Sequence, residues 1–104
     1  MKQIQIFPFS RDGYHYDVQP GYAPVFEVDT SSPETPFLFS TPEFGGGGLG
    51  SLGSTVADCV TNMQDHIHEV YTSVRFCDEH LGILNEEGLG LLGFYNSRLK
   101  ITKL

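Results

Sequence analysis

Basic residues are absent from most of this chain. Between Asp12 and Val74 there is no Lys or Arg, although nine carboxylates fall in this stretch, and the six basic residues lie nearer the ends. Because no cation inside the stretch can neutralise these carboxylates, the surface that it builds is expected to be negative. Phosphate binding requires Lys and Arg to displace counterions, so the net charge of −7 argues against nucleic acid as a direct ligand. Anionic membrane surfaces are disfavoured for the same reason.

Long apolar runs and cysteines are scarce as well. No window approaches the roughly 20 apolar residues that span a bilayer, and Gln and Pro interrupt the N-terminal segment MKQIQIFPFS. We therefore expect a soluble protein of the cytoplasm. The two cysteines, Cys59 and Cys77, fall in one predicted helix and would lie about 27 Å apart along its axis, too far to form a disulfide with each other.

The residues that are present indicate one α+β domain over residues 1–104. A chain of 104 residues is long enough for one modest core, and its 39% apolar and 12% aromatic content exclude a wholly disordered chain. The composition changes along the chain. Residues 1–44 are expected to be β-rich, residues 45–53 to be a glycine-rich connection, and residues 54–104 to be helical.

The β-rich part is expected to form an antiparallel meander of about four short strands. Apolar and polar residues alternate before and after Asp12-Gly13, a dipeptide typical of tight hairpin turns. Pro24 has no amide hydrogen to donate, which favours the start of a strand or a sheet edge. The strands are predicted over Lys2–Phe9, Tyr14–Val18, Ala23–Thr30 and Pro36–Ser40.

The glycine-rich segment GGGGLGSLG at residues 45–53 is interpreted as a hinge, or else as a loop that a partner orders. It contains the pattern Gly48-x-Gly50-x-x-Gly53 ahead of a helix, which superficially matches a dinucleotide-binding fingerprint. That fingerprint requires a strand running directly into its first glycine, whereas residues 41–44 and three further glycines intervene here. We therefore do not expect nucleotide binding.

A long helix is predicted from Thr55, which fits a capping box with Asp58. Apolar residues recur along it at alternating spacings of four and three, a heptad pattern typical of helix-on-helix packing. The helix would run 27 residues to Leu81, about 40 Å, which exceeds the roughly 33 Å diameter of a compact 100-residue domain. We therefore predict a homodimer or higher oligomer, although the stripe could instead pack on the sheet of its own domain. The predicted oligomerisation residues are Val60, Met63, Ile67, Val70, Val74 and Leu81.

Two alternatives remain open for the C-terminal segment. Asn85 could cap a second helix that folds back on the first after Gly82. The segment Arg98–Leu104 alternates between polar and apolar residues and could instead form a closing strand. The fold is therefore expected to end in a short helix or a strand.

Metal-binding and catalytic sets are incomplete in this sequence. The long helix is rich in His, Cys, Asp and Glu, but the spacings bring together only the pairs Cys77 with His80, His66 with Glu69, and Asp65 with Glu69. Cys77 lies beside Asp78 and Glu79, which disfavour an activated thiolate, and no serine lies in a recognisable nucleophile motif. We predict no enzymatic activity, no cofactor and no metal site.

These exclusions leave a binding module. In size and composition, though in no motif, the chain resembles the compact inhibitors encoded by phages and other mobile elements, and the immunity proteins or antitoxins that neutralise basic nucleases. Its carboxylates would occupy the sites at which a basic protein partner meets nucleic acid, with aromatic side chains at the centre of the contact. A self-assembling scaffold, kept soluble by its charge, is the alternative.

The sequence also indicates which carboxylates and aromatic side chains would contact the partner. The predicted partner-binding residues are Asp12, Tyr14, Tyr16 and Asp17 in the hairpin, and Asp65 and Glu69 on the helix. The aromatic residues expected on the surface of the β-rich part are Phe7, Phe9, Tyr14, Tyr16 and Tyr22.

The protein is not expected to bind DNA or RNA by itself. Chromatography on heparin at low ionic strength tests this expectation, because a net charge of −7 and a long stretch without Lys or Arg leave no gain from counterion release. Retention on heparin, or on a labelled duplex, would show that the charge argument is wrong.

Overall fold

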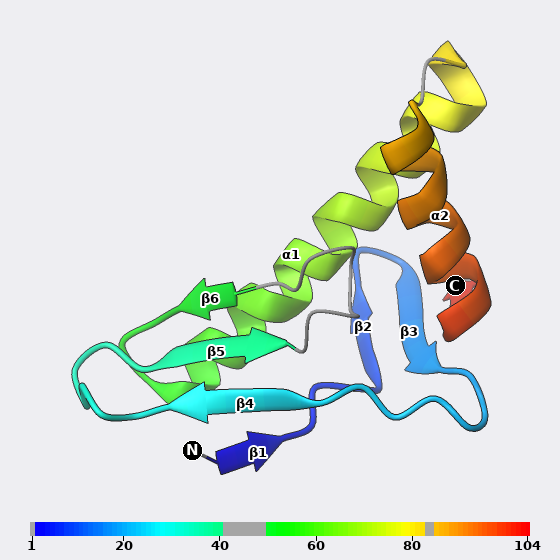
Figure 1. The fold of residues 1–104 in the computed structure, drawn as a ribbon. Coiled ribbons are helices and arrows are strands. Elements are labelled where there is room, and N and C mark those ends of the chain that lie inside the picture. Colours follow the sequence, from blue (N-terminus) through cyan, green and yellow to red (C-terminus); the bar gives the residue numbers. More distant parts are fainter. Residues whose placement is uncertain (1, 41–49, 83–84) are drawn as a thin grey trace.

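Two antiparallel sheets and two helices make up the α+β fold (Figure 1). The computed structural model describes residues 2–40, 50–82 and 85–104. The elements among these residues are β1 (Lys2–Ile4), β2 (Phe9–Arg11), β3 (Tyr14–Val18), β4 (Phe26–Asp29), β5 (Phe37–Ser40), β6 (Gly50–Leu52), α1 (Val56–Phe76), η2 (Cys77–Leu81), α2 (Glu86–Arg98) and β7 (Leu99–Lys103). The short π-helix η2 continues α1. None of the helices in these residues is both long enough and apolar enough to span a membrane.

The predicted meander is divided between two sheets. The strand order is β1-β4-β5-β6 in the first sheet and β2-β3-β7 in the second. The predicted strand Lys2–Phe9 breaks because Pro8 has no amide hydrogen for a ladder, so β1 joins the first sheet and β2 the second. This break adds one strand, and β6 in the predicted glycine-rich connection adds another, so the described residues form six strands before α1, where about four were predicted. The chain crosses between the sheets at residues 5–8 and again at residues 19–25.

The predicted hairpin around Asp12-Gly13 is confirmed. β2 pairs with β3, and Arg11 lies opposite Tyr14, which leaves a turn of two residues. Asp12 and Gly13 have φ angles of 47° and 82°, and positive values at both positions are typical of a type I′ turn. The sharp turn leaves Asp12 at the tip of the hairpin.

Part of the glycine-rich segment is built into the fold. Residues 50–52 form β6, in which Leu52 lies opposite Phe37 of β5. Gly53 then approaches the first turn of α1 so closely that a Cβ there would lie 2.7 Å from Asp58 Cβ and 2.9 Å from the backbone N of Cys59. Residues 50–53 are thus tied to the sheet and the helix instead of forming a hinge. The remaining residues of the predicted hinge, 45–49, lie outside the described residues.

Helix α1 begins at the predicted cap and packs into the core of its own chain. Thr55 Oγ1 accepts a hydrogen bond from the Asp58 amide at 3.1 Å. Its main buried row recurs every four positions, and a row with this spacing drifts around the helix, unlike a heptad seam. The residues of the row are Cys59, Met63, Ile67 and Tyr71.

The prediction of an oligomer interface is therefore wrong for two of its residues. Met63 and Ile67 are each 0% exposed within the single chain, so they have no surface to offer a second copy. Val60, Val70 and Val74 are only partly buried. The side chain of Leu81 lies outside what the structure describes. The heptad count misled because the sheets of the same chain cover the middle of this stripe.

Helix α2 lies beside the part of α1 that extends past the sheets (Figure 1). Asn85 caps it, since Asn85 Oδ1 accepts a hydrogen bond from the Gly88 amide at 2.8 Å. Tyr95 of α2 is fully buried, and its ring centroid lies 5.9 Å from that of Tyr71. Gly82, with a φ of 63°, ends the first arm as predicted. Both C-terminal alternatives occur in succession, because β7 follows α2 and pairs with β3.

Replacing Ile67 by Ala should lower the free energy of unfolding by about 2–5 kcal/mol, because it leaves a cavity in the core. Urea unfolding measures this loss, and Val74→Ala serves as a partly exposed control with a loss of about 1 kcal/mol or less. If Ile67 instead held an oligomer together, the unfolding midpoint of the wild type would rise with protein concentration and that of Ile67→Ala would not.

Candidate functional site

Three of the predicted partner-binding residues lie on one surface. Asp65 and Glu69 are one turn apart on α1, and the hairpin tip brings Asp12 beside them. Asp12 Oδ2 lies 3.4 Å from Nε2 of His68, and the Asp12 side chain is 81% exposed. We call Asp12, Asp65 and Glu69 the turn–helix surface. The hairpin and the helix together build it from residues that are far apart in the sequence.

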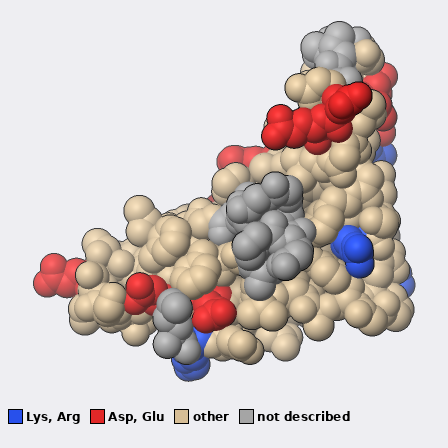
Figure 2. Space-filling view, in the orientation of Figure 1, with Lys and Arg blue, Asp and Glu red and all other residues tan. Residues whose placement is uncertain are grey.

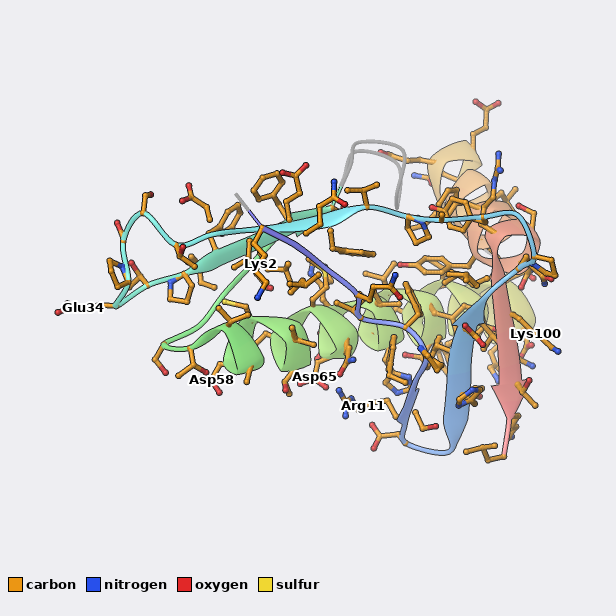
Figure 3. The ribbon with its side chains drawn as sticks, turned by 90° about the horizontal axis from the view of Figure 1, so that it is seen from below. Lys2, Arg11, Glu34, Asp58, Asp65 and Lys100 are labelled. Carbon is orange, nitrogen blue, oxygen red and sulfur yellow. The ribbon has the colours of Figure 1, made fainter. Side chains whose placement is uncertain are left out.

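Arg11 partly neutralises the turn–helix surface. Its Nε lies 2.7 Å from Asp65 Oδ1 as an ion pair, although this N–H makes no hydrogen bond with the carboxylate. Figure 3 shows Arg11 beside Asp65. Arg11 Nη2 also donates to Gln64 Oε1 at 3.1 Å, and Gln64 Nε2 donates to the carbonyl of Ile6 at 2.9 Å. These contacts fix the hairpin against α1 and leave Asp12 and Glu69 as the carboxylates of this surface without a Lys or Arg partner in the described residues.

Tyr16 does not belong to the surface, contrary to the prediction. It is 0% exposed, and its hydroxyl lies 2.5 Å from Nδ1 of His68. In the tautomer that carries its hydrogen on Nε2, His68 accepts from Tyr16 and turns its N–H toward Asp12. Burial raises the pKa of the Tyr16 hydroxyl above its ordinary value, and the nearby Tyr71 adds to the shift. A buried hydroxyl that holds its proton this firmly connects β3 to α1 and offers no nucleophile to a substrate.

The other aromatic side chains are also less exposed than predicted. Phe9 is buried, and Phe7, Tyr14 and Tyr22 are partly buried. The Tyr14 ring centroid lies 5.8 Å from the His68 ring and packs against the core. These residues were expected to form an exposed contact region, but the small sheets use them as their own core.

Asp17 lies away from the turn–helix surface. It is at the far end of β3 from the hairpin tip, opposite Lys100 of β7. Its Oδ1 accepts a hydrogen bond from the Val18 amide at 2.8 Å. The structure therefore separates Asp17 from the carboxylates with which the sequence grouped it.

Carboxylates dominate the rest of the described surface. Of the nine between Asp12 and Val74, eight are described, none is buried, and only Asp65 has a Lys or Arg within 4 Å. The backbone hydrogen bond from Ser31 lowers the pKa of Asp29, and the hydroxyl of Ser54 lowers the pKa of Asp58. Both groups stay ionised at neutral pH.

The predicted pairs of metal-ligating residues gain no third ligand among the described residues. Within residues 2–40, 50–82 and 85–104, no three His, Cys, Asp or Glu residues lie together as a group that could hold an ion. Cys59 Sγ donates to the carbonyl of Pro36 at 3.1 Å, and burial raises the pKa of this thiol. Cys59 therefore acts as a buried packing residue.

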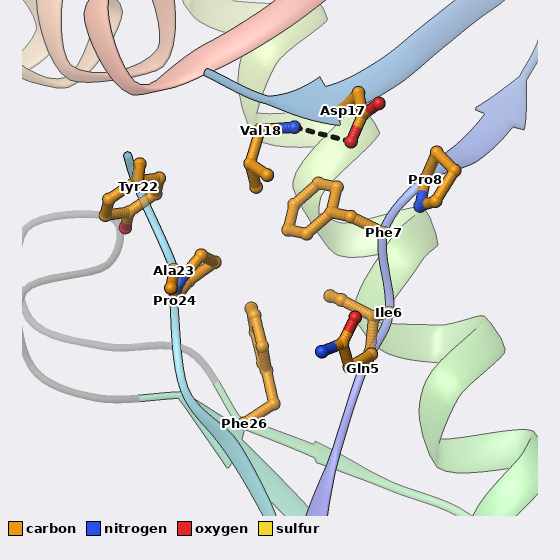
Figure 4. Close-up of a pocket in the computed structure, with 10 residues that line it drawn as sticks. All are labelled: Gln5, Ile6, Phe7, Pro8, Asp17, Val18, Tyr22, Ala23, Pro24 and Phe26. Carbon is orange, nitrogen blue, oxygen red and sulfur yellow. Dashed lines mark hydrogen bonds between the residues drawn. The ribbon is translucent and has the colours of Figure 1, made fainter. Parts of the chain in front are cut away.

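A cavity of about 270 Å³ lies between the two crossings of the chain (Figure 4). Residues 5–8 of the first crossing and residues 22–24 of the second line it. Asp17, Val18 and Phe26 complete the lining from the adjoining strands. Asp17 is the only charged residue in this set, so the cavity combines apolar walls with one carboxylate.

Comparisons with protein-family models, with curated proteins and with solved structures gave no match for this chain. The assignment of function therefore rests on the residues of this chain.

The sequence pointed to the carboxylates but missed the residues that organise them. Arg11 precedes the cation-free stretch, and nothing in its local sequence indicates Asp65 as its partner. From the sequence, His68 counted only among the histidines of the long helix, and it falls in none of the predicted metal pairs. Its position about 200° around the helix from His66 was a usable signal, because it turns the His68 ring toward a different neighbour. Nothing in the sequence indicated the cavity, because its walls come largely from two connections without regular secondary structure.

Replacing Tyr16 by Phe should lower the free energy of unfolding by about 1–3 kcal/mol, because Nδ1 of the buried His68 loses its partner. Chemical unfolding at neutral pH measures the change. Tyr14→Phe, which removes a hydroxyl from the same strand, is the control and should cost less. Equal losses for the two variants would show that the contact with His68 contributes nothing specific.

Proposed function

We propose that this protein is a small, acidic, non-catalytic binding module that acts in the cytoplasm and covers the basic surface of a nucleic-acid-handling partner. In this role it would inhibit the partner by occlusion. The known class that fits this description best is that of inhibitors encoded by mobile elements, immunity proteins and antitoxins. No fold relationship underlies this comparison, which depends on size and charge.

The observation that carries the proposal is the lack of internal neutralisation. Seven of the eight described carboxylates between Asp12 and Val74 have no Lys or Arg within 4 Å. A protein stabilised by its own ion pairs would place cations among these groups. Uncompensated negative charge on the surface attracts a positively charged partner over distances of about a Debye length.

On the face that Figure 2 shows, most acidic side chains lie apart from most basic ones. Arg98 is the last residue of α2, and Lys100 and Lys103 follow it in β7. Figure 2 shows Asp and Glu at the free end of the helix pair and on the sheet at the lower left, and Lys and Arg mainly on the right. Separated charge orients an approaching partner, which raises the rate of association more than it lowers the rate of dissociation.

The turn–helix surface is the best candidate for the contact. Asp12 and Glu69 are exposed and have no Lys or Arg partner in the described residues, and the ion pair of Arg11 with Asp65 holds the hairpin against α1. In the complex, Asp12 and Glu69 would take the place of nucleic-acid phosphates opposite Arg and Lys of the partner. Occlusion of this kind requires no catalytic group.

A self-assembling scaffold is the second candidate. Val60, Val70 and Val74 are only partly buried, which leaves part of each side chain available for a contact with a second copy. A homodimer is compatible with either function. Light scattering at high concentration tests it, and a mass of 11.5 kDa, that of one chain, would exclude it.

The immobilised protein should retain basic, nucleic-acid-binding proteins from a cell lysate at low salt and release them as salt rises. Glu69→Lys should weaken this retention, mainly through slower association, because it reverses a charge on the turn–helix surface. Glu34→Lys makes the same change of charge in the exposed loop between β4 and β5 and serves as the matched control. Equal effects of the two variants would indicate that net charge alone matters, and salt-independent retention would contradict the proposal.

A further inference from the structure

The two crossings between the sheets run on either side of an open cleft. The β1–β4 ladder ends at the pair Ile4 and Phe26, and beyond this pair the two segments diverge. Figure 4 shows them apart, with the side chains of Phe7 and Phe26 between them. The cavity of about 270 Å³ that they enclose falls just below the range of about 300–1,000 Å³ typical of drug-sized ligands. Its size therefore suits a single amino-acid side chain.

The walls of this cavity are aromatic. The ring centroids of Phe7 and Phe26 lie 6.1 Å apart, and Tyr22 contributes a third ring to the lining. Tyr22 already packs against a cation of its own chain, since Arg98 Cζ lies 5.6 Å from its ring centroid. Aromatic rings attract cations through their faces and also pack against the aliphatic stems of Lys and Arg.

Asp17 supplies the one charge of the lining. The hydrogen bond from the Val18 amide holds its carboxylate at the end of β3, and no described Lys or Arg lies within 4 Å of it. A partly buried carboxylate beside aromatic walls favours an ammonium or guanidinium group over a neutral one.

We infer that this cavity receives a Lys or Arg side chain of the basic partner. The aliphatic stem of that side chain packs against Phe7 and Phe26, and its charged end meets Asp17. The inference takes its partner from the proposed function, but the chemistry of the cavity is tested without that partner. It assigns Asp17 to a specific anchor, in contrast to the long-range attraction of the turn–helix surface.

Lys100 offers a second test of the role of the Asp17 carboxylate. It stands opposite Asp17 in the β3–β7 ladder, and directly opposite residues project from the same face of a sheet. The ammonium group of Lys100 therefore competes with an incoming cation for Asp17. Removing the charge of Asp17 and removing the charge of Lys100 should change the affinity for a cation in opposite directions.

The experiment is an NMR titration of the ¹⁵N-labelled protein with Nα-acetyl-lysine methylamide, with the arginine analogue, and with the neutral norleucine analogue. The amides of Val18 and Phe26 should shift with the two cationic probes, with a Kd on the order of 1 mM, and about fivefold more weakly with norleucine. Asp17→Asn keeps an oxygen for the Val18 amide and should weaken cation binding about fivefold, while Lys100→Met should strengthen it. Asp29→Asn, whose carboxylate likewise accepts a backbone hydrogen bond, should leave binding unchanged.

Equal affinity for norleucine, or equal effects of Asp17→Asn and Lys100→Met, would overturn the inference and assign the cavity to an apolar side chain. The absence of any shift at Val18 and Phe26 would overturn it as well. Neither result touches the proposed function, which the turn–helix surface supports separately. Conversely, binding of the cationic probes without retention of any basic protein from a lysate would contradict the proposed function and leave the cavity assignment standing.

Discussion

The packing of α1 across both sheets is the constraint on which the rest of the structure depends. Among the described residues the two sheets share no hydrogen-bonded strand pair, so the helix fixes their relation. Near its start, Cys59 donates to the carbonyl of Pro36 beside the first sheet. Nearer its end, the ring centroid of Tyr71 lies 6.0 Å from that of Tyr16 in the second sheet. Each fully buried apolar side chain of this row contributes about 1.5–3 kcal/mol. Surface ion pairs contribute only about 0–1 kcal/mol each to the free energy of unfolding, less than these buried side chains.

Both candidate contact regions follow from this arrangement. Because α1 holds the second sheet against its flank, the hairpin tip lies beside the helix, and Asp12 joins Asp65 and Glu69 on one surface. Because two separate sheets are joined by two extended crossings, a cleft with aromatic walls remains between those crossings. The first region suits attraction at a distance and the second suits a specific anchor. A basic partner that presents a protruding Lys or Arg would use both.

Local chemistry was predictable from the sequence, whereas distant partnerships were not. The caps at Thr55 and Asn85 and the turn at Asp12-Gly13 depend on neighbouring residues. The cap at Thr55 and the turn occur as expected, and the cap at Asn85 was one of the two alternatives for its segment. The stripe on α1 was read as a heptad seam because the sequence alone does not say which side of a helix its own sheets cover. Tyr16 was placed on the surface because alternation within a strand does not show which face is buried. The charge of the chain was countable, but the pairing of Arg11 with Asp65 depends on the tertiary fold.

The central claim is that the acidic surface occludes a partner that otherwise binds nucleic acid. Competition measured by fluorescence anisotropy tests it most directly, with a labelled duplex bound to a basic protein that this chain retains. The account predicts that adding the protein releases the duplex completely, at a concentration that rises with salt. A stable ternary complex, with the duplex still bound at saturating protein, would contradict occlusion.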